Sequence, residues 1–124
     1  MAYYAELDNQ DNVLRVIAVN DNDNLDPVTQ LETEEAGIAF CKSLYGEETI
    51  WLKTSYNNNI RGNYASEGYL YIREHDIFMP PKPFDSWTLD VDNAEWVAPV
   101  EYPVEPVGVY KHWNEELQQW EVQE

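Results

Sequence analysis

The sequence has 124 residues, which favours one domain, or one domain with an appended arm, and is long enough to form a core without disulfides. Its 24 Asp and Glu against 7 Lys and Arg give a formal net charge of −17, which counts against binding to nucleic acid or to an anionic membrane surface. We expect neither a membrane span nor a signal peptide, because no apolar run is long enough and the first residues carry no basic stretch.

Aromatic residues indicate a folded chain despite this charge, since disordered acidic segments are poor in them, and five Trp, nine Tyr and three Phe are present. The beginning of the chain predicts a β-hairpin at residues 3–7 and 13–19, two aromatic and β-branched runs separated by Asn and Asp. Apolar side chains occur on both faces of the second strand, so we expect both faces to be covered. A further strand is predicted at residues 49–54.

One helix is predicted, from about Leu31 to Tyr45. Thr33 is a suitable N-cap, and the two glutamates after it favour the positive end of a helix. An apolar stripe recurs at three- and four-residue steps and consists of Ile38, Cys41, Leu44 and Tyr45. Gly46 suits the position that ends a helix. We expect the striped face to lie on the flanking strands.

From Gly68 onward the sequence contains an internal repeat. Each of three copies has two apolar anchors seven positions apart: Tyr71 and Phe78, Leu89 and Trp96, Trp113 and Trp120. This spacing predicts a hairpin whose anchors lie on neighbouring strands, joined by a bulge or by a turn longer than two residues.

Prolines follow the first two copies, at residues 80–83 and 99–103, and favour extended links. We therefore predict an α+β fold that is mostly β. Residues 1–67 form a compact βα body, and residues 68–124 form aromatic β-hairpin repeats with Pro-rich links, the last hairpin being 108–124. Because isolated hairpins are marginal in water, these must pack on the body, on one another or on a neighbouring chain.

Catalytic and metal-binding patterns are weak. Asp and Asn at residues 21–26 and 90–93 are ligand types that Ca²⁺ prefers, but neither run completes a calcium loop, and turns explain both better. Cys41 is the only cysteine, which excludes an internal disulfide and a thiolate-built zinc site, and His75 and His112 fall in or beside hairpin turns. No glycine-rich phosphate loop occurs, and no carboxylate pair stands out. We expect no enzyme activity, no metal and no cofactor.

Aromatic side chains are the candidate binding residues, because large rings dominate protein interfaces and a proline-stiffened backbone loses little entropy on docking. The partner-binding candidates are Trp87, Trp96, Tyr102, Tyr110, Trp113 and Trp120. The rings of this half also suit a sugar-stacking platform, or they hold the hairpins together and fill a thin core. Of these last two roles, we favour the core.

Several segments carry distinctive motifs: GIAFC at 37–41, WLKTSYNNNIRGNYA at 51–65, FMPPKP at 78–83 and WVAPVEYP at 96–103. They resemble a group of small proteins encoded by marine tailed phages, cyanobacterial phages among them, which are usually described only as virion structural or hypothetical proteins. The resemblance covers about residues 1–103 and part of the last hairpin. It implies a place on a virus particle and supplies no catalytic residue.

These observations lead to an accessory virion structural protein, made in the host cytoplasm and exposed on the particle. It would decorate the head or attach to a tail or fibre, and would bind other virion proteins and copies of itself. The alternative is a carbohydrate-binding appendage whose rings contact host glycans.

Overall fold

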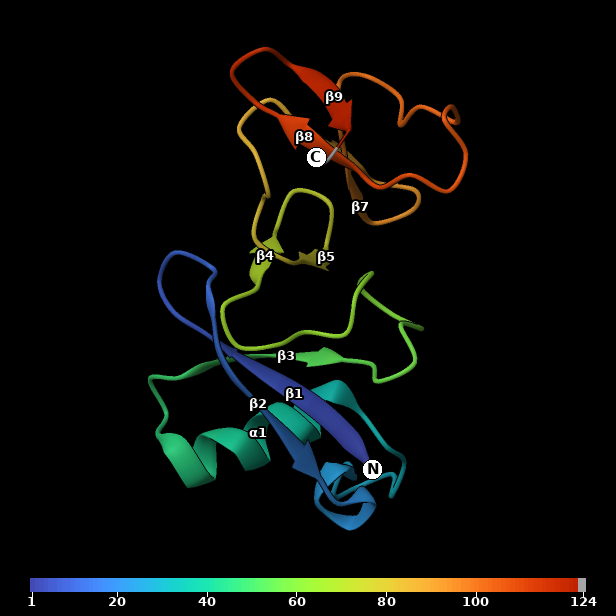
Figure 1. The fold of residues 1–124 in the computed structure, drawn as a ribbon. Helices are drawn as coiled ribbons and strands as arrows, with labels where there is room; N and C mark the ends of the chain where they lie inside the picture. The colour runs from blue at the N-terminus through green and yellow to red at the C-terminus, as the bar shows by residue number, and fades with distance from the viewer. Residues whose placement is uncertain (123–124) are drawn as a thin grey trace. The chain divides into compact units, whose positions relative to one another are not determined.

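The computed structural model describes residues 1–122 and divides the chain into two compact units, Met1–Pro81 (unit 1) and Lys82–Glu124 (unit 2). Small antiparallel sheets and an α-helix give the predicted α+β fold, mostly β (Figure 1). Residues 123 and 124, which end the predicted last hairpin, lie outside the described residues. In the part of the chain that the structure describes, no helix has the length and apolar character needed to cross a bilayer.

A three-stranded antiparallel sheet in the order β2-β1-β3 forms the middle of unit 1. The strands are β1 (Ala2–Leu7), β2 (Val13–Val19) and β3 (Ile50–Thr54), as the sequence predicts to within two residues at either end. The Asp8 carboxylate shapes the turn between β1 and β2 by accepting hydrogen bonds from the backbone N–H groups of Gln10 and Asn12, at 2.8 and 2.9 Å. Because β1 has a partner on each side, almost its whole length is buried.

The prediction that both faces of β2 are covered is wrong at Leu14 and at Ala18, which are both exposed. Glu6 pairs with Arg15 and Leu7 with Val13, so Leu14 has no residue opposite it and is the extra residue of a β-bulge. The bulge turns this side chain away from the core, and it is 42% exposed. Hydropathy alone cannot reveal such a change in register.

Helix α1 (Glu34–Tyr45) packs against β3 and β1. The Thr33 Oγ1 accepts a hydrogen bond from the Ala36 N–H, so Thr33 is the predicted N-cap, and the helix begins directly after it rather than at Leu31. Gly46 ends the helix with a φ of 123°, a value that favours glycine. In the stripe, Cys41 is fully buried against the sheet, whereas Leu44 is 59% exposed.

Helix and sheet approach most closely at Gly37, where a Cβ atom would overlap the ring of Tyr4. The Tyr4 hydroxyl is itself buried and donates a hydrogen bond to Asn24 Oδ1. No space for a side chain is left at this contact, so the glycine is required by packing.

We expect Gly37→Ala to destabilise the protein by about 1–3 kcal/mol, because overpacking outweighs the better helix propensity of alanine. Thermal unfolding measures the change. Ser43→Ala, at an exposed position of the same helix, is the control and should shift the melting temperature little. Equal stability of Gly37→Ala and wild type would contradict the close contact.

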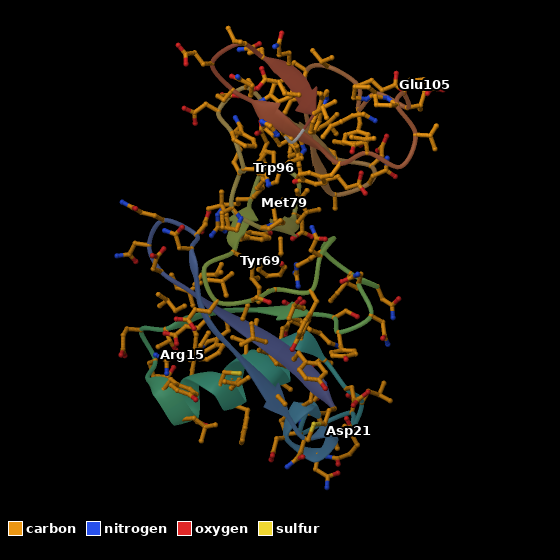
Figure 2. All side chains as sticks on the ribbon, in the orientation of Figure 1. Arg15, Asp21, Tyr69, Met79, Trp96 and Glu105 are labelled. Carbon is orange, nitrogen blue, oxygen red and sulfur yellow. The ribbon has the colours of Figure 1, made fainter. Side chains whose placement is uncertain are left out.

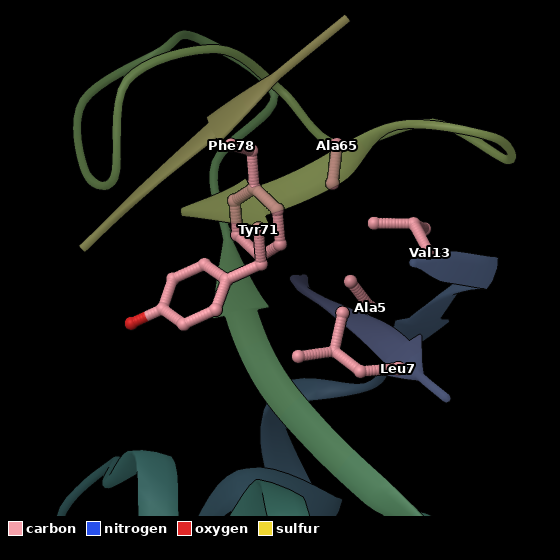
Figure 3. Packing of buried hydrophobic residues seen from close by; sticks show 6 residues of the cluster. All are labelled: Ala5, Leu7, Val13, Ala65, Tyr71 and Phe78. Carbon is pink, nitrogen blue, oxygen red and sulfur yellow. The ribbon is translucent and has the colours of Figure 1, made fainter. Parts of the chain in front are cut away.

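The first repeat hairpin, β4 (Leu70–Ile72) and β5 (Ile77–Met79), packs on the sheet within unit 1 (Figure 3). A cluster of six buried side chains joins them: Ala5, Leu7, Val13, Ala65, Tyr71 and Phe78. Val13 also donates a backbone hydrogen bond to Tyr69 O at 2.8 Å. The boundary between the compact units therefore follows Pro81 and not residue 67, because this hairpin buries its anchors against β1.

Arg61 ties three parts of unit 1 together. Its guanidinium donates to both oxygens of Glu34 at the helix start, to the Lys53 carbonyl on β3 at 2.8 Å, and to Asp76 in the β4–β5 turn at 2.8 Å. Tyr71 donates a second hydrogen bond to Asp76. Partial burial acts to raise the pKa of the Asp76 carboxyl, but the bonds from Tyr71 and Arg61 outweigh it and hold this pKa below its usual range.

We expect Asp76→Asn to lower the free energy of unfolding at pH 7 by up to about 1 kcal/mol, since the largely exposed carboxylate is screened by solvent. A depressed carboxyl pKa stabilises the fold above the unfolded-state value, and this stabilisation is lost as pH falls through the folded-state pKa. The difference between variant and wild type should therefore shrink in acid, as measured by urea unfolding at several pH values. Glu74→Gln, in the same turn, is the control and should have little effect at either pH.

The other two repeats form hairpins in unit 2: β6 (Thr88–Asp90) with β7 (Glu95–Val97), and β8 (Lys111–Asn114) with β9 (Gln119–Val122). In all three hairpins the predicted anchors lie directly opposite each other. Each turn has four residues, longer than the two-residue type, and its last residue is left-handed: Asp76, Ala94 and Gln118, with φ of 54°, 51° and 51°. The repeated spacing in the sequence thus corresponds to a repeated turn geometry.

Candidate functional site

Four of the six predicted partner-binding side chains pack against one another inside unit 2. The ring centroid of Trp120 lies 5.2 Å from that of Trp113, 4.9 Å from that of Tyr102 and 6.0 Å from that of Trp87, each in an edge-to-face arrangement. Trp113 is only 7% exposed. These rings pack at the centre of unit 2, where large aromatic side chains supply most of the contact area.

The other two predicted residues lie elsewhere on unit 2. Trp96 (Figure 2) is partly buried, and the Lys82 ammonium lies 5.9 Å from its ring centroid. Tyr110 is 68% exposed. Of the six predicted residues, the structure thus buries Trp113, leaves Trp87, Trp96 and Trp120 partly buried, and exposes Tyr102 and Tyr110.

Glu115 joins the ring cluster to the segment before β6. Its carboxylate accepts hydrogen bonds from the Ser86 N–H at 2.9 Å, the Ser86 hydroxyl at 2.6 Å and the Trp113 indole N–H at 2.8 Å. The Ser86 bond, followed by that from Trp113, holds the pKa of the Glu115 carboxyl below its usual range. A single ionised carboxylate thus links two hairpins that would be marginal alone.

We expect Glu115→Gln to lower the melting temperature of the protein at pH 7. Because the folded-state pKa is depressed, the contribution of Glu115 exists above its unfolded-state pKa and disappears as pH falls through the folded-state value, so the difference from wild type should close in acid. Tryptophan fluorescence during heating reports on the ring cluster. The matched control is Glu116→Gln, one residue along and exposed, and an equal loss in both variants would contradict this role of Glu115.

Lys111 stabilises the Pro-rich loop before β8 by hydrogen bonds to its backbone carbonyls. Its side chain is buried, and its ammonium donates to the carbonyls of Pro103 and Pro106 at 3.1 and 2.9 Å. The same ammonium lies 5.3 Å from the ring centroid of Tyr102, whose hydroxyl accepts a bond from the Lys111 backbone N–H. A lysine in this place satisfies carbonyls that the prolines leave without a β-ladder partner.

The loop held in this way exposes apolar side chains to water. Six large ones occur between residues 97 and 110, with exposed fractions from 42 to 80%: Val97, Val100, Tyr102, Val104, Val107 and Tyr110. We refer to these six side chains as the 97–110 surface. Val104 and Val107 are the most exposed of them and are not among the sequence-predicted binding residues, although their alternation with prolines in VEPVGV is a visible signal.

An open groove of about 280 Å³ adjoins this surface within unit 2. Its lining combines aromatic, aliphatic and acidic side chains: Trp87, Glu95, Trp96, Val97, Ala98, Val100, Glu101, Tyr102 and Trp120. Glu95 and Glu101 make its character anionic. The combination suits a partner that offers apolar side chains together with a positive charge.

Three other residues that the sequence singles out, Cys41, Asp26 and Asp90, have structural roles. Cys41 packs against Tyr4 and Trp51, and burial raises the pKa of its thiol to about 11, which keeps it protonated at neutral pH. Asp26 and Asp90 accept hydrogen bonds from backbone N–H groups in their own turns. Among residues 1–122, no group of three His, Cys, Asp or Glu side chains is arranged to hold a metal ion.

Known proteins offer no functional assignment. A scan against protein-family models, a search of curated proteins and a search of solved structures each returned no match.

Proposed function

We propose that this chain is an accessory structural protein of a phage virion, carried on the outside of the particle, which binds other virion proteins through the 97–110 surface. The observation that supports a binding role is the presence of six exposed apolar side chains within fourteen residues of an otherwise strongly acidic chain. The virion setting comes from the resemblance of four sequence segments to phage structural proteins.

The loop is suited to binding because its shape is fixed before the partner arrives. Prolines restrict its backbone, and Lys111 bonds two of its carbonyls. A preorganised loop loses less conformational entropy on docking, and each valine that a partner covers contributes about 1–2 kcal/mol. Binding therefore gains from the same side chains that cost free energy while they are exposed.

The partner we expect has an apolar surface bordered by Lys or Arg. The groove beside the 97–110 surface carries Glu95 and Glu101, and the whole chain has a net charge of −17. Opposite charge on the partner would accelerate association and fix its orientation. The same argument works against self-association through this surface alone, since two copies would bring like charges together.

Glycan binding by the Trp rings has less support. Trp113 is only 7% exposed, and it stands edge to face with both Trp120 and Trp87, so these rings first of all pack on one another. A sugar needs a free ring face on which to stack.

We expect the double change Val104→Ser with Val107→Ser to reduce incorporation of the protein into particles about tenfold, because most of the apolar area of two exposed valines is lost. Quantitative mass spectrometry of purified particles measures the amount of the chain relative to the major shell protein. The melting temperature should change little, since both side chains are solvent-exposed.

The matched control is Val28→Ser, a valine of unit 1 that is 88% exposed. Unchanged incorporation of the double variant, an equal loss in the control, or absence of the wild-type chain from purified particles would each overturn the proposal. Normal incorporation combined with weaker attachment of particles to cells would favour the carbohydrate-binding alternative.

A further inference from the structure

A second groove, of about 310 Å³, lies in unit 1 and has a different chemistry. Tyr3 on β1 is paired with Thr54 at the end of β3, so the chain that follows β3 passes beside the start of β1. The groove lies between them and is lined by Met1, Ala2, Tyr3, Lys53, Thr54, Ser55, Tyr56, Asn57, Asn59 and Ile60. We name it the tyrosine groove.

Tyr3 and Tyr56 line one side of the groove, and Tyr64 packs against both of them. The ring centroid of Tyr56 lies 6.2 Å from that of Tyr3 and 5.4 Å from that of Tyr64, and the centroids of Tyr3 and Tyr64 are 5.6 Å apart. Contact with two neighbouring rings orients Tyr56, yet its side chain is 67% exposed. An aromatic ring that is held in place and open to solvent is available to a ligand.

Three polar side chains of the groove have no partner among the described residues, whereas the Thr54 and Ser55 hydroxyls accept backbone hydrogen bonds. The side-chain amides of Asn57 and Asn59 and the ammonium of Lys53 take part in no hydrogen bond or ion pair among residues 1–122. No Asp or Glu lines the groove, although the chain has 24 of them. The groove therefore offers hydrogen-bond donors and amide acceptors without a carboxylate to repel or neutralise a ligand.

We propose that the tyrosine groove binds a neutral hexose unit of a saccharide. The electron-rich face of an aromatic ring attracts the polarised C–H groups on the flat side of a hexose, and Tyr56 provides such a face. Each Asn amide both donates and accepts, which matches sugar hydroxyls, while Lys53 adds three donors. The volume is at the lower end of the range of about 300–1,000 Å³ for ligand pockets, which suits a small ligand.

A neutral sugar is chosen over an acidic one because of the charge of the chain. Lys53 is one cation against a net charge of −17, so the overall field repels anionic glycans. A protein segment is a poorer occupant, since most lining residues carry hydroxyl, amide or ammonium groups rather than aliphatic side chains. The unit 2 groove is the reverse, with two carboxylates, four rings and three small aliphatic residues.

This inference does not depend on the proposed docking role, because the two grooves lie in different units and share no residue. The sugar-binding alternative predicted from the sequence is thereby moved from unit 2 to unit 1. The candidate sugar-binding rings become Tyr3 and Tyr56 of unit 1 instead of the tryptophans of unit 2.

The test is an NMR titration of the full chain, tagged at the C-terminus because Met1 lines the groove, with neutral oligosaccharides of glucose, mannose and galactose. With at least one of them we expect a dissociation constant of about 1 mM or lower, with shifts concentrated in the side-chain amides of Asn57 and Asn59. A monosaccharide arm shows whether a single hexose suffices or a chain is needed.

Tyr56→Ala should weaken binding about tenfold, and Tyr56→Phe, which keeps the ring, should restore most of it. Asn59→Ala, at an exposed position, is a second variant that should fold normally and bind more weakly. Tyr110→Ala is the matched control: Tyr110 is 68% exposed, close to the 67% of Tyr56, but lies in unit 2, so its removal should not alter binding.

The proposal would be overturned by the absence of shifts with every sugar at about 10 mM. It would also be overturned by equal losses in Tyr56→Ala and Tyr110→Ala, or by shifts centred on the indole N–H groups of unit 2. Neither of the first two outcomes bears on incorporation into particles, so failure here is distinct from failure of the docking role.

Discussion

The structure depends on the need of each short hairpin to bury its pair of anchors. Two-stranded ribbons of three or four residues are marginal in water by themselves. In unit 1, Tyr71 and Phe78 meet this need by packing on Ala5 and Leu7 of the sheet. In unit 2 no sheet of that size is present among the described strands, and Trp113 with Trp120 packs on neighbouring rings instead. This requirement accounts for the aromatic residues of the second half. The packed rings therefore need no ligand to explain them.

A second constraint is the scarcity of positive charge. With 7 basic residues against 24 acidic ones, the cations with several partners serve as internal links. Arg61 joins the helix, β3 and the first hairpin turn, and Lys111 holds the Pro-rich loop by its carbonyls. The excess of acidic residues gives the chain its net charge of −17, which favours partners of opposite charge.

Local patterns predicted the elements of the fold well. The seven-residue spacing identified three hairpins with their anchors opposite each other, and Thr33 and Gly46 marked the helix ends. The predictions that failed concern contacts between distant parts of the chain. The membership of the first hairpin in unit 1 depends on contacts with β1, and the exposure of Leu14 depends on a bulge, and neither has a signature in composition or periodicity.

The candidate surfaces were less predictable than the fold because burial depends on which segments meet. Trp113 and Tyr110 are equivalent aromatic candidates in the sequence, yet one is 7% and the other 68% exposed. Tyr3 and Tyr56 come together only through the pairing of β1 with β3.

The two grooves have opposite chemistry, since one carries carboxylates beside aliphatic groups and the other carries amides and a lysine. Salt would therefore weaken association of a basic protein with the first, and would have little effect on a neutral sugar in the second, because only the first interaction is screened. The two proposed interactions would therefore rest on different forces.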